Sequence, residues 1–292
     1  GVIEGCPVVS VDADFWSLDD PVVDLTGCAS LRELGCDVPY GGEVDASGLA
    51  DLERASVSGC SSADFSGCPA LSELQVGGPL GYLALSGASS LERLDISFLT
   101  VLGGDDHLLS GTGLAEALAG SPSLESLSIG LGSPRDVAPA LGDLALPSLP
   151  SLRELSLGPV GVESLDLTGC PALEYVYCEG NLLESLDLSA LPSLVSLDCS
   201  DNLLTSLDVS GCPSLTWLDC SRNRIADLSE LRDWLQLKGH DGSIEPQLAG
   251  AGGSEGLLYE IRYSESGEAE AHVIGYERPE GVEAAGAVVV PG

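Results

Sequence analysis

The chain contains little positive charge and few aromatic side chains, and it has no methionine. Its 292 residues include 46 Asp and Glu against 11 Lys and Arg, which gives a formal net charge of −35. A field of this sign repels the phosphate backbone of nucleic acids and anionic membrane surfaces. We therefore expect no nucleic-acid partner. The charged partners that the composition favours are cations and basic protein surfaces.

Long apolar runs are also missing, although 44% of the residues are hydrophobic. No run approaches the ~20 apolar residues of a membrane-spanning helix, so direct membrane insertion is not expected. Aromatic residues make up only 4% of the chain. The core must therefore be built mainly from Leu, Val, Ala and Cys.

The motifs of common catalytic sites are absent as well. There is no G-x-S-x-G, P-loop or H-E-x-x-H motif, and His107, His240 and His272 are scattered along the chain. The segment GGDDH at 103–107 is interpreted as a solvated loop. No C-x2-C pair or Cys/His cluster with the spacing of zinc ligands occurs. We expect no enzyme and no catalytic residues.

What the chain does contain is a repeat. Leu173, Leu194 and Leu215 lie 21 residues apart. Three cysteines and three asparagines follow with the same period: Cys178, Cys199, Cys220, Asn181, Asn202 and Asn223. Such self-similarity indicates a solenoid, in which each repeat buries its apolar face against its neighbours. The same leucine position recurs earlier, at Leu31, Leu52, Leu71, Leu91, Leu124 and Leu152.

Each of these leucines begins a short apolar alternation, such as LSELQV at 71–76 or LESLSI at 124–129. Alternation with a period of two predicts one strand in each repeat. Because all these strands run in the same direction, we expect an α/β-type repeat fold. It is a curved solenoid with a parallel sheet along its concave face.

The return leg of the repeat has its own signature, D-[LVFA]-[ST]-[GA], beginning seven residues before a repeat leucine. Its aspartates are Asp24, Asp45, Asp64, Asp166, Asp187 and Asp208. The pattern predicts an extended convex leg that ends in a tight turn, with Leu165, Leu186 and Leu207 pointing inward.

Two interpretations of the aspartate column remain open. In the first, each carboxylate serves its own turn by accepting backbone N–H groups. Alternatively, calcium, which prefers carboxylate oxygens, bridges neighbouring repeats. Asp198 and Asp219 form a second such pair on the concave side. No other cofactor is expected.

Two repeats are longer than the others, with 33 residues from Leu91 and 28 residues from Leu124. The first contains a predicted helix that starts at Thr112 or Gly113 and is stopped at Gly120. Extra length in repeat proteins maps to loops. Both insertions are therefore expected to bulge on the convex side or at an edge.

The regular repeats end after Asn223, and a helix over 227–239 is predicted to cap them. Asp227 is its expected N-cap, and Glu230 is expected to complete a capping box. The composition of 239–256 predicts a flexible linker.

The last part of the chain contains two alternating runs around 264–267, which predict a β-hairpin followed by a third strand. We therefore expect three parts. These are a capped solenoid over 1–238, the linker over 239–256, and a hairpin plus strand over 257–292 as the start of a truncated downstream module.

These motifs resemble those of a known class of proteins. Residues 31–223 resemble bacterial leucine-rich repeat proteins with repeats of the kind LxxLxCxxNxLxxLDLSGCP. The segment YEIRYSESGEAEAHVIGYERPE, followed by AVVVPG, resembles the opening of BspA-type leucine-rich repeat domains. The resemblance implies a fragment of a longer surface or secreted protein. It also implies protein binding or adhesion, with no shared catalytic site.

The cysteine and asparagine columns are predicted to be structural. Small thiols are among the most buried side chains, and stacked columns offer no selective pairing. We therefore expect free core thiols, with disulfides as the alternative. An amide buried at the turn satisfies backbone groups of its own repeat and of its neighbour.

The concave face is where a solenoid binds. In its N-terminal half, Glu33, Arg54, Glu73 and Arg93 alternate in sign and are expected to pair with one another. In its C-terminal half, aromatic and acidic residues replace them, and Trp and Tyr dominate interface hot spots. The candidate binding residues are Tyr175, Tyr177, Asp198, Trp217 and Asp219. The alternative is that the aromatic residues pack on the cap helix or on each other.

The main functional hypothesis is a monomeric, non-catalytic scaffold of a bacterial surface or secreted protein, extracellular in location. It binds a protein or a glycan through the concave face. Two alternatives stay open. One is a structural spacer that presents a downstream domain, and the other is an intracellular inhibitor-like repeat protein, which the free thiols favour.

Overall fold

The structure is a computed structural model of the chain. It describes residues 10–14, 22–98, 110–131, 141–237, 239–248, 257–263 and 269–276. The GGDDH segment, Cys6 and the predicted third strand after the hairpin lie outside these residues.

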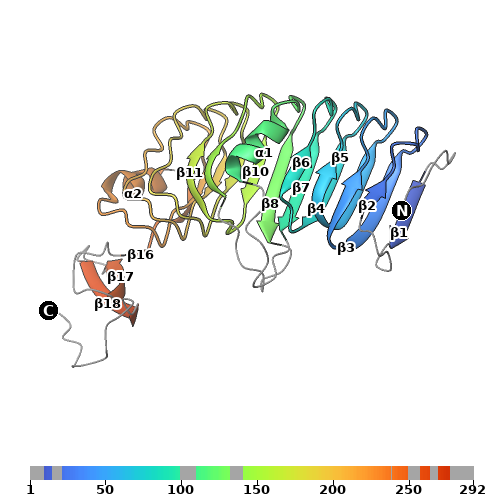
Figure 1. Cartoon of the computed structure of the whole chain (residues 1–292). Helices are drawn as coiled ribbons and strands as arrows, with labels where there is room; N and C mark the ends of the chain where they lie inside the picture. Colours follow the sequence, from blue (N-terminus) through green and yellow to red (C-terminus); the bar gives the residue numbers. More distant parts are fainter. Residues whose placement is uncertain are drawn as a thin grey trace.

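The main body is a curved solenoid whose strands stack into one long parallel sheet (Figure 1). Neighbouring strands pair in register, so equivalent positions of successive repeats form rows across the sheet. This confirms the predicted leucine-rich repeat solenoid. The strands along the concave sheet are β1 (Ser10–Asp14), β3 (Glu33–Asp45), β4 (Arg54–Asp64), β5 (Glu73–Gly78), β7 (Arg93–Phe98), β8 (Ser126–Leu131), β10 (Glu154–Leu157), β12 (Tyr175–Tyr177), β13 (Ser196–Asp198), β14 (Trp217–Asp219) and β15 (Asp241–Ser243).

The convex legs are extended, as predicted, and some of them pair. The short convex strands are β2 (Val22–Asp24), β6 (Tyr82–Ala84), β9 (Gly142–Ala145) and β11 (Val162–Asp166). β2 pairs with the far end of β3, β6 with the far end of β4, and β9 with β11. Leu165, Leu186 and Leu207 are buried at 8–9% exposure, which confirms that they point inward.

The aspartates of the convex column cap their own turns. The Asp187 carboxylate accepts the backbone N–H of Ser189 at 2.9 Å, and Asp208 accepts that of Ser210 at 2.8 Å. The same bond, from the residue two positions on, occurs at Asp24, Asp45, Asp64 and Asp166. The first interpretation of this column is therefore confirmed, and calcium bridging is not tested by the structure.

In the 33-residue repeat, the helix α1 (Gly111–Leu118) replaces the convex strand. It contacts β6 on one side and β9 on the other, so it lies in the convex layer (Figure 1). The Ser110 hydroxyl caps the helix by accepting the Gly113 N–H at 3.2 Å. The helix therefore begins slightly earlier than the predicted start, and it buries Leu114 and Leu118 in the core.

The core consists of stacked apolar columns, mainly leucine, and it contains nine described cysteines, all buried free thiols. The prediction of free core thiols is confirmed for these nine. Burial raises the pKa of Cys36 to about 11 and that of Cys220 to about 12. Because the thiolate is the reactive form, these side chains act as small apolar residues.

The asparagine column is structural, as predicted. The Asn202 amide donates to the carbonyl oxygens of Cys178, Cys199 and Ser200 at 2.9–3.2 Å, and its oxygen accepts the Leu183 N–H at 3.0 Å. One side chain thus joins the turn of its own repeat to the turn of the preceding repeat.

The cap helix is shorter than predicted and has a different N-cap. α2 (Ser229–Leu235) begins after Leu228, which makes no side-chain cap hydrogen bond. The predicted capping box of Asp227 and Glu230 is therefore wrong. Asp227 instead accepts the backbone N–H of Ser229 at 2.9 Å, like the other aspartates of its column. Leu228 is drawn into the core at 2% exposure, which delays the start of the helix.

The segment predicted as a flexible linker begins with a further repeat. β15 pairs in parallel with β14, and Gln247 continues the asparagine column. The Gln247 oxygen accepts the Ile225 N–H at 3.0 Å, and its amide donates to the carbonyl oxygens of Cys220 and Ile244 at 2.8 and 2.7 Å. The linker prediction is therefore wrong for 239–248. It missed this repeat because a glutamine stands in the asparagine position and no leucine marks the strand.

The predicted hairpin is present in the described C-terminal residues. β17 (Leu257–Tyr263) pairs antiparallel with β18 (Ala269–Tyr276). The short strand β16 (Gln247–Leu248) adds to the other edge of β17.

Candidate binding face

The concave face presents two rows of outward side chains. In each strand the residue three positions after the repeat leucine is buried, as at Leu74, Leu127 and Leu197. Its two neighbours point the other way, because side chains alternate along a strand. The strand register then aligns the first row: Glu33, Arg54, Glu73, Arg93, Ser126, Glu154, Tyr175, Ser196 and Trp217. The second row is Gly35, Ser56, Gln75, Asp95, Ser128, Ser156, Tyr177, Asp198 and Asp219.

The structure brings the five predicted binding residues together on β12, β13 and β14. We call this group the aromatic patch: Tyr175, Tyr177, Asp198, Trp217 and Asp219. Tyr175 is 39% exposed, and Trp217 and Tyr177 are half-buried. Ser196 separates the two aromatic residues of the first row, whose backbones are about 10 Å apart at the usual strand spacing.

These aromatic rings do not stack on one another or on the cap helix. Within the described chain, the ring contact found is between Trp234 and His240, with centroids 4.3 Å apart. Trp234 packs against the core, whereas Trp217, Tyr175 and Tyr177 are not among the side chains packed there. Tyr175, Tyr177 and Trp217 are therefore partly or well exposed on the concave surface and make no ring contact within the described chain.

The two acids of the aromatic patch have a local structural role. Asp198 accepts the backbone N–H and the hydroxyl of Ser200, at 3.0 and 2.6 Å. Asp219 does the same with Ser221, at 2.9 and 2.6 Å. Each carboxylate therefore holds the tight turn that follows its strand. Both carboxylates also place a fixed negative charge beside the aromatic rings.

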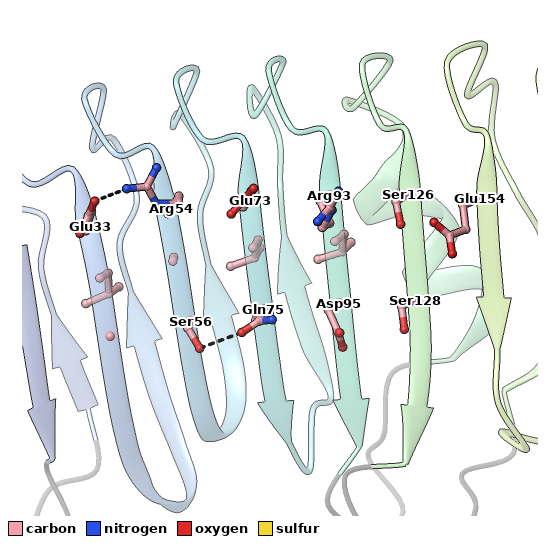
Figure 2. Close-up of a pocket in the computed structure, with 15 residues that line it drawn as sticks. Glu33, Arg54, Ser56, Glu73, Gln75, Arg93, Asp95, Ser126, Ser128 and Glu154 are labelled. Atoms are coloured by element: carbon pink, nitrogen blue, oxygen red, sulfur yellow. Dashed lines mark hydrogen bonds and ion pairs between the residues drawn. The ribbon is translucent and has the colours of Figure 1, made fainter.

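The N-terminal half of the face encloses a polar hollow of about 700 Å³, shown in Figure 2. We call it the N-terminal hollow. It lies over β3 to β10, and the polar side chains that line it are Glu33, Arg54, Ser56, Glu73, Gln75, Arg93, Asp95, Ser126, Ser128 and Glu154. The sequence did not single it out as a site. The sequence feature that could have identified it is the pair of small serines on β8, between charged residues of β7 and β10.

Charge pairing in the N-terminal hollow is incomplete, contrary to the sequence-based expectation. Glu33 and Arg54 form an ion pair, and the Ser56 hydroxyl bonds to Gln75 at 3.3 Å. Glu73 and Arg93 are register neighbours, yet among the described residues neither has an ion-pair partner within 4.0 Å. The two side chains are therefore available to a ligand.

Asp95 lies in the same hollow, two residues along β7 from Arg93. Partial burial raises the pKa of its carboxyl above the ordinary value. Its register neighbour on β8 is Ser128, which is too small to cover it.

Among the described residues, no group of three or more His, Cys, Asp or Glu side chains is arranged to hold a metal ion. In the same part of the chain, no helix has both the length and the apolar character needed to cross a membrane.

A family model and several solved structures are similar to parts of this chain. A family model described as leucine-rich repeats in two copies matches residues 192–233. None of the curated proteins matches the chain in sequence. Among solved structures, an internalin (inlF) from Listeria monocytogenes is 17% identical, with a TM-score of 0.40 over 76% of this chain and 77% of that one.

Two further structures are similar. A functional domain of InlJ from Listeria monocytogenes, described as including a cysteine ladder, is 19% identical, with a TM-score of 0.40 over 82% of this chain and 54% of that one. A leucine-rich repeat protein from Leptospira interrogans is 14% identical, with a TM-score of 0.46 over 81% of this chain and 77% of that one.

Proposed function

We propose that this leucine-rich repeat chain is a non-catalytic scaffold that binds a protein ligand through its concave face. We place it in a bacterial surface or secreted protein, as a monomer. Solenoids bind through such surfaces because the stacked strands hold many side chains in fixed positions. A scaffold of this kind needs no catalytic group, and none of the sequence motifs points to one.

The observation that carries the proposal is the aromatic patch. Only 4% of the residues are aromatic, and three of them lie on the outward rows of β12 and β14, with the single strand β13 between them. Exposed Trp and Tyr supply large contact area at a low cost in conformational entropy and dominate interface hot spots. A monomer that had no ligand for this face would gain nothing from placing its rings there.

The test is a binding measurement with a matched aromatic control. The ligand is first captured on the immobilised full chain and its chemical class is identified, and its affinity is then measured by surface plasmon resonance. Trp217→Ala is expected to weaken binding by about 30-fold, as for a hot-spot residue. Tyr82 is 54% exposed and lies on the convex strand β6, so Tyr82→Ala is the control and should leave the affinity unchanged.

Two results would contradict the proposal. One is equal affinity for Trp217→Ala, Tyr177→Ala and the control, which excludes the patch. The other is a purified ligand that proves to be a glycan, which excludes the protein class while keeping the face.

The free thiols favour a second candidate, an intracellular binding protein. None of the nine described cysteines forms a disulfide, and reduced thiols are typical of reducing compartments. Fractionation of the source cells, followed by detection of the full-length protein, distinguishes this candidate from the surface protein.

A further inference from the structure

The N-terminal hollow is built around a gap between charged strands. Ser126 and Ser128 on β8 form its floor, with Arg93 and Asp95 on one side and Glu154 on the other. Figure 2 shows the Glu154 side chain extending from β10 toward β8. Short serine side chains between longer charged ones leave room for a side chain from outside.

The charges of the hollow do not balance. Glu33 and Arg54 neutralise each other in their ion pair. Glu73, Asp95 and Glu154 then face one remaining cation, Arg93. The excess is negative within a chain whose net charge is −35, so the hollow favours a ligand group with positive charge.

We propose that the N-terminal hollow is a second recognition site, which takes an arginine side chain of a basic protein segment over Ser126 and Ser128, between the carboxylates of Asp95 and Glu154. The site extends the proposed function. It rests on that function in one respect, which is that the ligand is a protein. It is separate from the aromatic patch and differs from it in chemistry.

The shape of the site suits a guanidinium group. Arginine presents five N–H donors in a planar fork, and the hollow offers two serine hydroxyls and two carboxylates as acceptors. Glu73, Asp95 and Glu154 carry three negative charges against the one positive charge of Arg93, so an incoming guanidinium is attracted although Arg93 lies beside it. Asp95 is partly buried and has no ion-pair partner among the described residues. An incoming guanidinium would supply one.

The test uses a peptide and does not depend on the natural ligand. The ¹⁵N-labelled full chain is titrated with the capped peptide Ac-Gly-Ser-Arg-Ser-Gly-NH2 and followed by NMR. The expected result is saturable shifts of the amide signals of Asp95, Ser126 and Ser128. The same peptide with citrulline, the neutral isostere of arginine, should cause no such shifts.

Matched variants separate a site from general attraction to an acidic protein. Asp95→Asn with Glu154→Gln is expected to weaken peptide binding by about fivefold for each carboxylate removed. Glu163→Gln with Glu184→Gln removes the same charge from exposed positions outside the hollow, and should leave the shifts at β8 unchanged.

The proposal is overturned if both double variants weaken binding equally, or if citrulline and arginine peptides produce the same shifts. Shifts spread over the whole surface, without saturation, would also reject it. Loss of ligand affinity in Trp217→Ala is a separate measurement, so a failure at the hollow is distinguishable from a failure of the proposed function.

Discussion

The early and late repeats of this solenoid turn the chain from its concave to its convex leg in different ways. In the early repeats, β3 and β4 continue as strands through the turn, so the backbones of the two repeats pair on both faces. In the late repeats, strands such as β13 stop after three residues, and buried Asn side chains bond the turn backbone instead. Both arrangements satisfy buried backbone groups, which are costly to leave unpaired.

The two regions also differ in what they offer a ligand. The early half of the concave face has the charged N-terminal hollow, whereas the late half has the aromatic patch. The regularity of a repeat and the chemistry of its concave surface are therefore set independently. The inward positions are constrained by stacking, while the outward positions are free to vary.

The largest expected effect is at the asparagine column. Asn202→Ala removes four hydrogen bonds within buried turns, one that the side-chain oxygen accepts and three that the side-chain NH2 group donates. It should lower the free energy of unfolding by about 4 kcal/mol, because the backbone groups are left unpaired. Unfolding in urea, followed by circular dichroism, measures the loss.

The control for this variant is Cys60→Ala in an early repeat. The Cys60 thiol makes one weak contact with the Gly77 carbonyl, at 3.6 Å, and the turn there is held by paired backbones. We expect a loss of about 1 kcal/mol. Equal losses for the two variants would mean that the turns are held in the same way.

The next effect tests the early turn through a glycine. Gly59 has φ of +80°, and a Cβ at this position would lie 2.1 Å from the Val38 carbonyl oxygen. Gly59→Ala should therefore cost about 3 kcal/mol and lower the midpoint of thermal unfolding. The Val38 carbonyl oxygen belongs to the backbone of β3, which cannot move away without breaking the pairing of β3 with β4.

Gly180→Ala is the matched variant in a late turn. Gly180 has φ of +72°, but the nearest atom to an added Cβ is the Pro159 Cβ, at 3.3 Å. Asp201 and Arg222 occupy the equivalent position in the next repeats with φ of 53° and 56°. We expect a cost of about 1 kcal/mol. A cost as large as that of Gly59→Ala would remove the proposed difference between the turns.

A smaller effect is the loss of stability in acid that comes from the aspartates of the convex turns in the late repeats. The backbone N–H of Ser189 holds the pKa of Asp187 below its usual value of 3.8, and the Ser210 hydroxyl does so for Asp208. Because the folded pKa is the lower one, these groups stabilise the fold above the unfolded pKa. That contribution is lost as the pH falls through the folded pKa.

We therefore expect this contribution to be lost, and the midpoint of thermal unfolding to fall with it, between about pH 5 and about pH 2. The variant Asp187→Asn should show a shallower fall than the parent chain, since one titrating group has been removed. Parallel curves for the two proteins would exclude a role for this carboxylate in the acid response.

The smallest expected effect is that of calcium. Each convex aspartate already accepts an N–H group of its own turn, and we propose that the fold needs no metal. The midpoint of thermal unfolding should therefore be the same in calcium chloride and in EDTA. A higher midpoint in calcium would establish bridging between repeats and would favour the alternative interpretation of the aspartate column.

Much of the fold was predictable because stacked repeats impose one environment on each inward position. The described members of the Leu, Cys and Asn columns took their predicted places, and the helix α1 formed with a start slightly earlier than predicted. The prediction failed where a repeat departs from the consensus. Gln247 performs the task of an asparagine. Helix α2 begins one residue later than predicted, after the buried Leu228, although Asp227 still accepts the backbone N–H of Ser229.

The sequence by itself determined which residues face the core, since the period of the apolar positions requires it. It also placed the five residues of the aromatic patch on neighbouring strands. Only the tertiary structure decided which charges pair across the sheet. Register puts Glu73 beside Arg93 as surely as Glu33 beside Arg54, but the side chains of one pair meet and those of the other do not. Surface ion pairs gain little energy, so local rotamers and space decide them, and the sequence does not encode these directly.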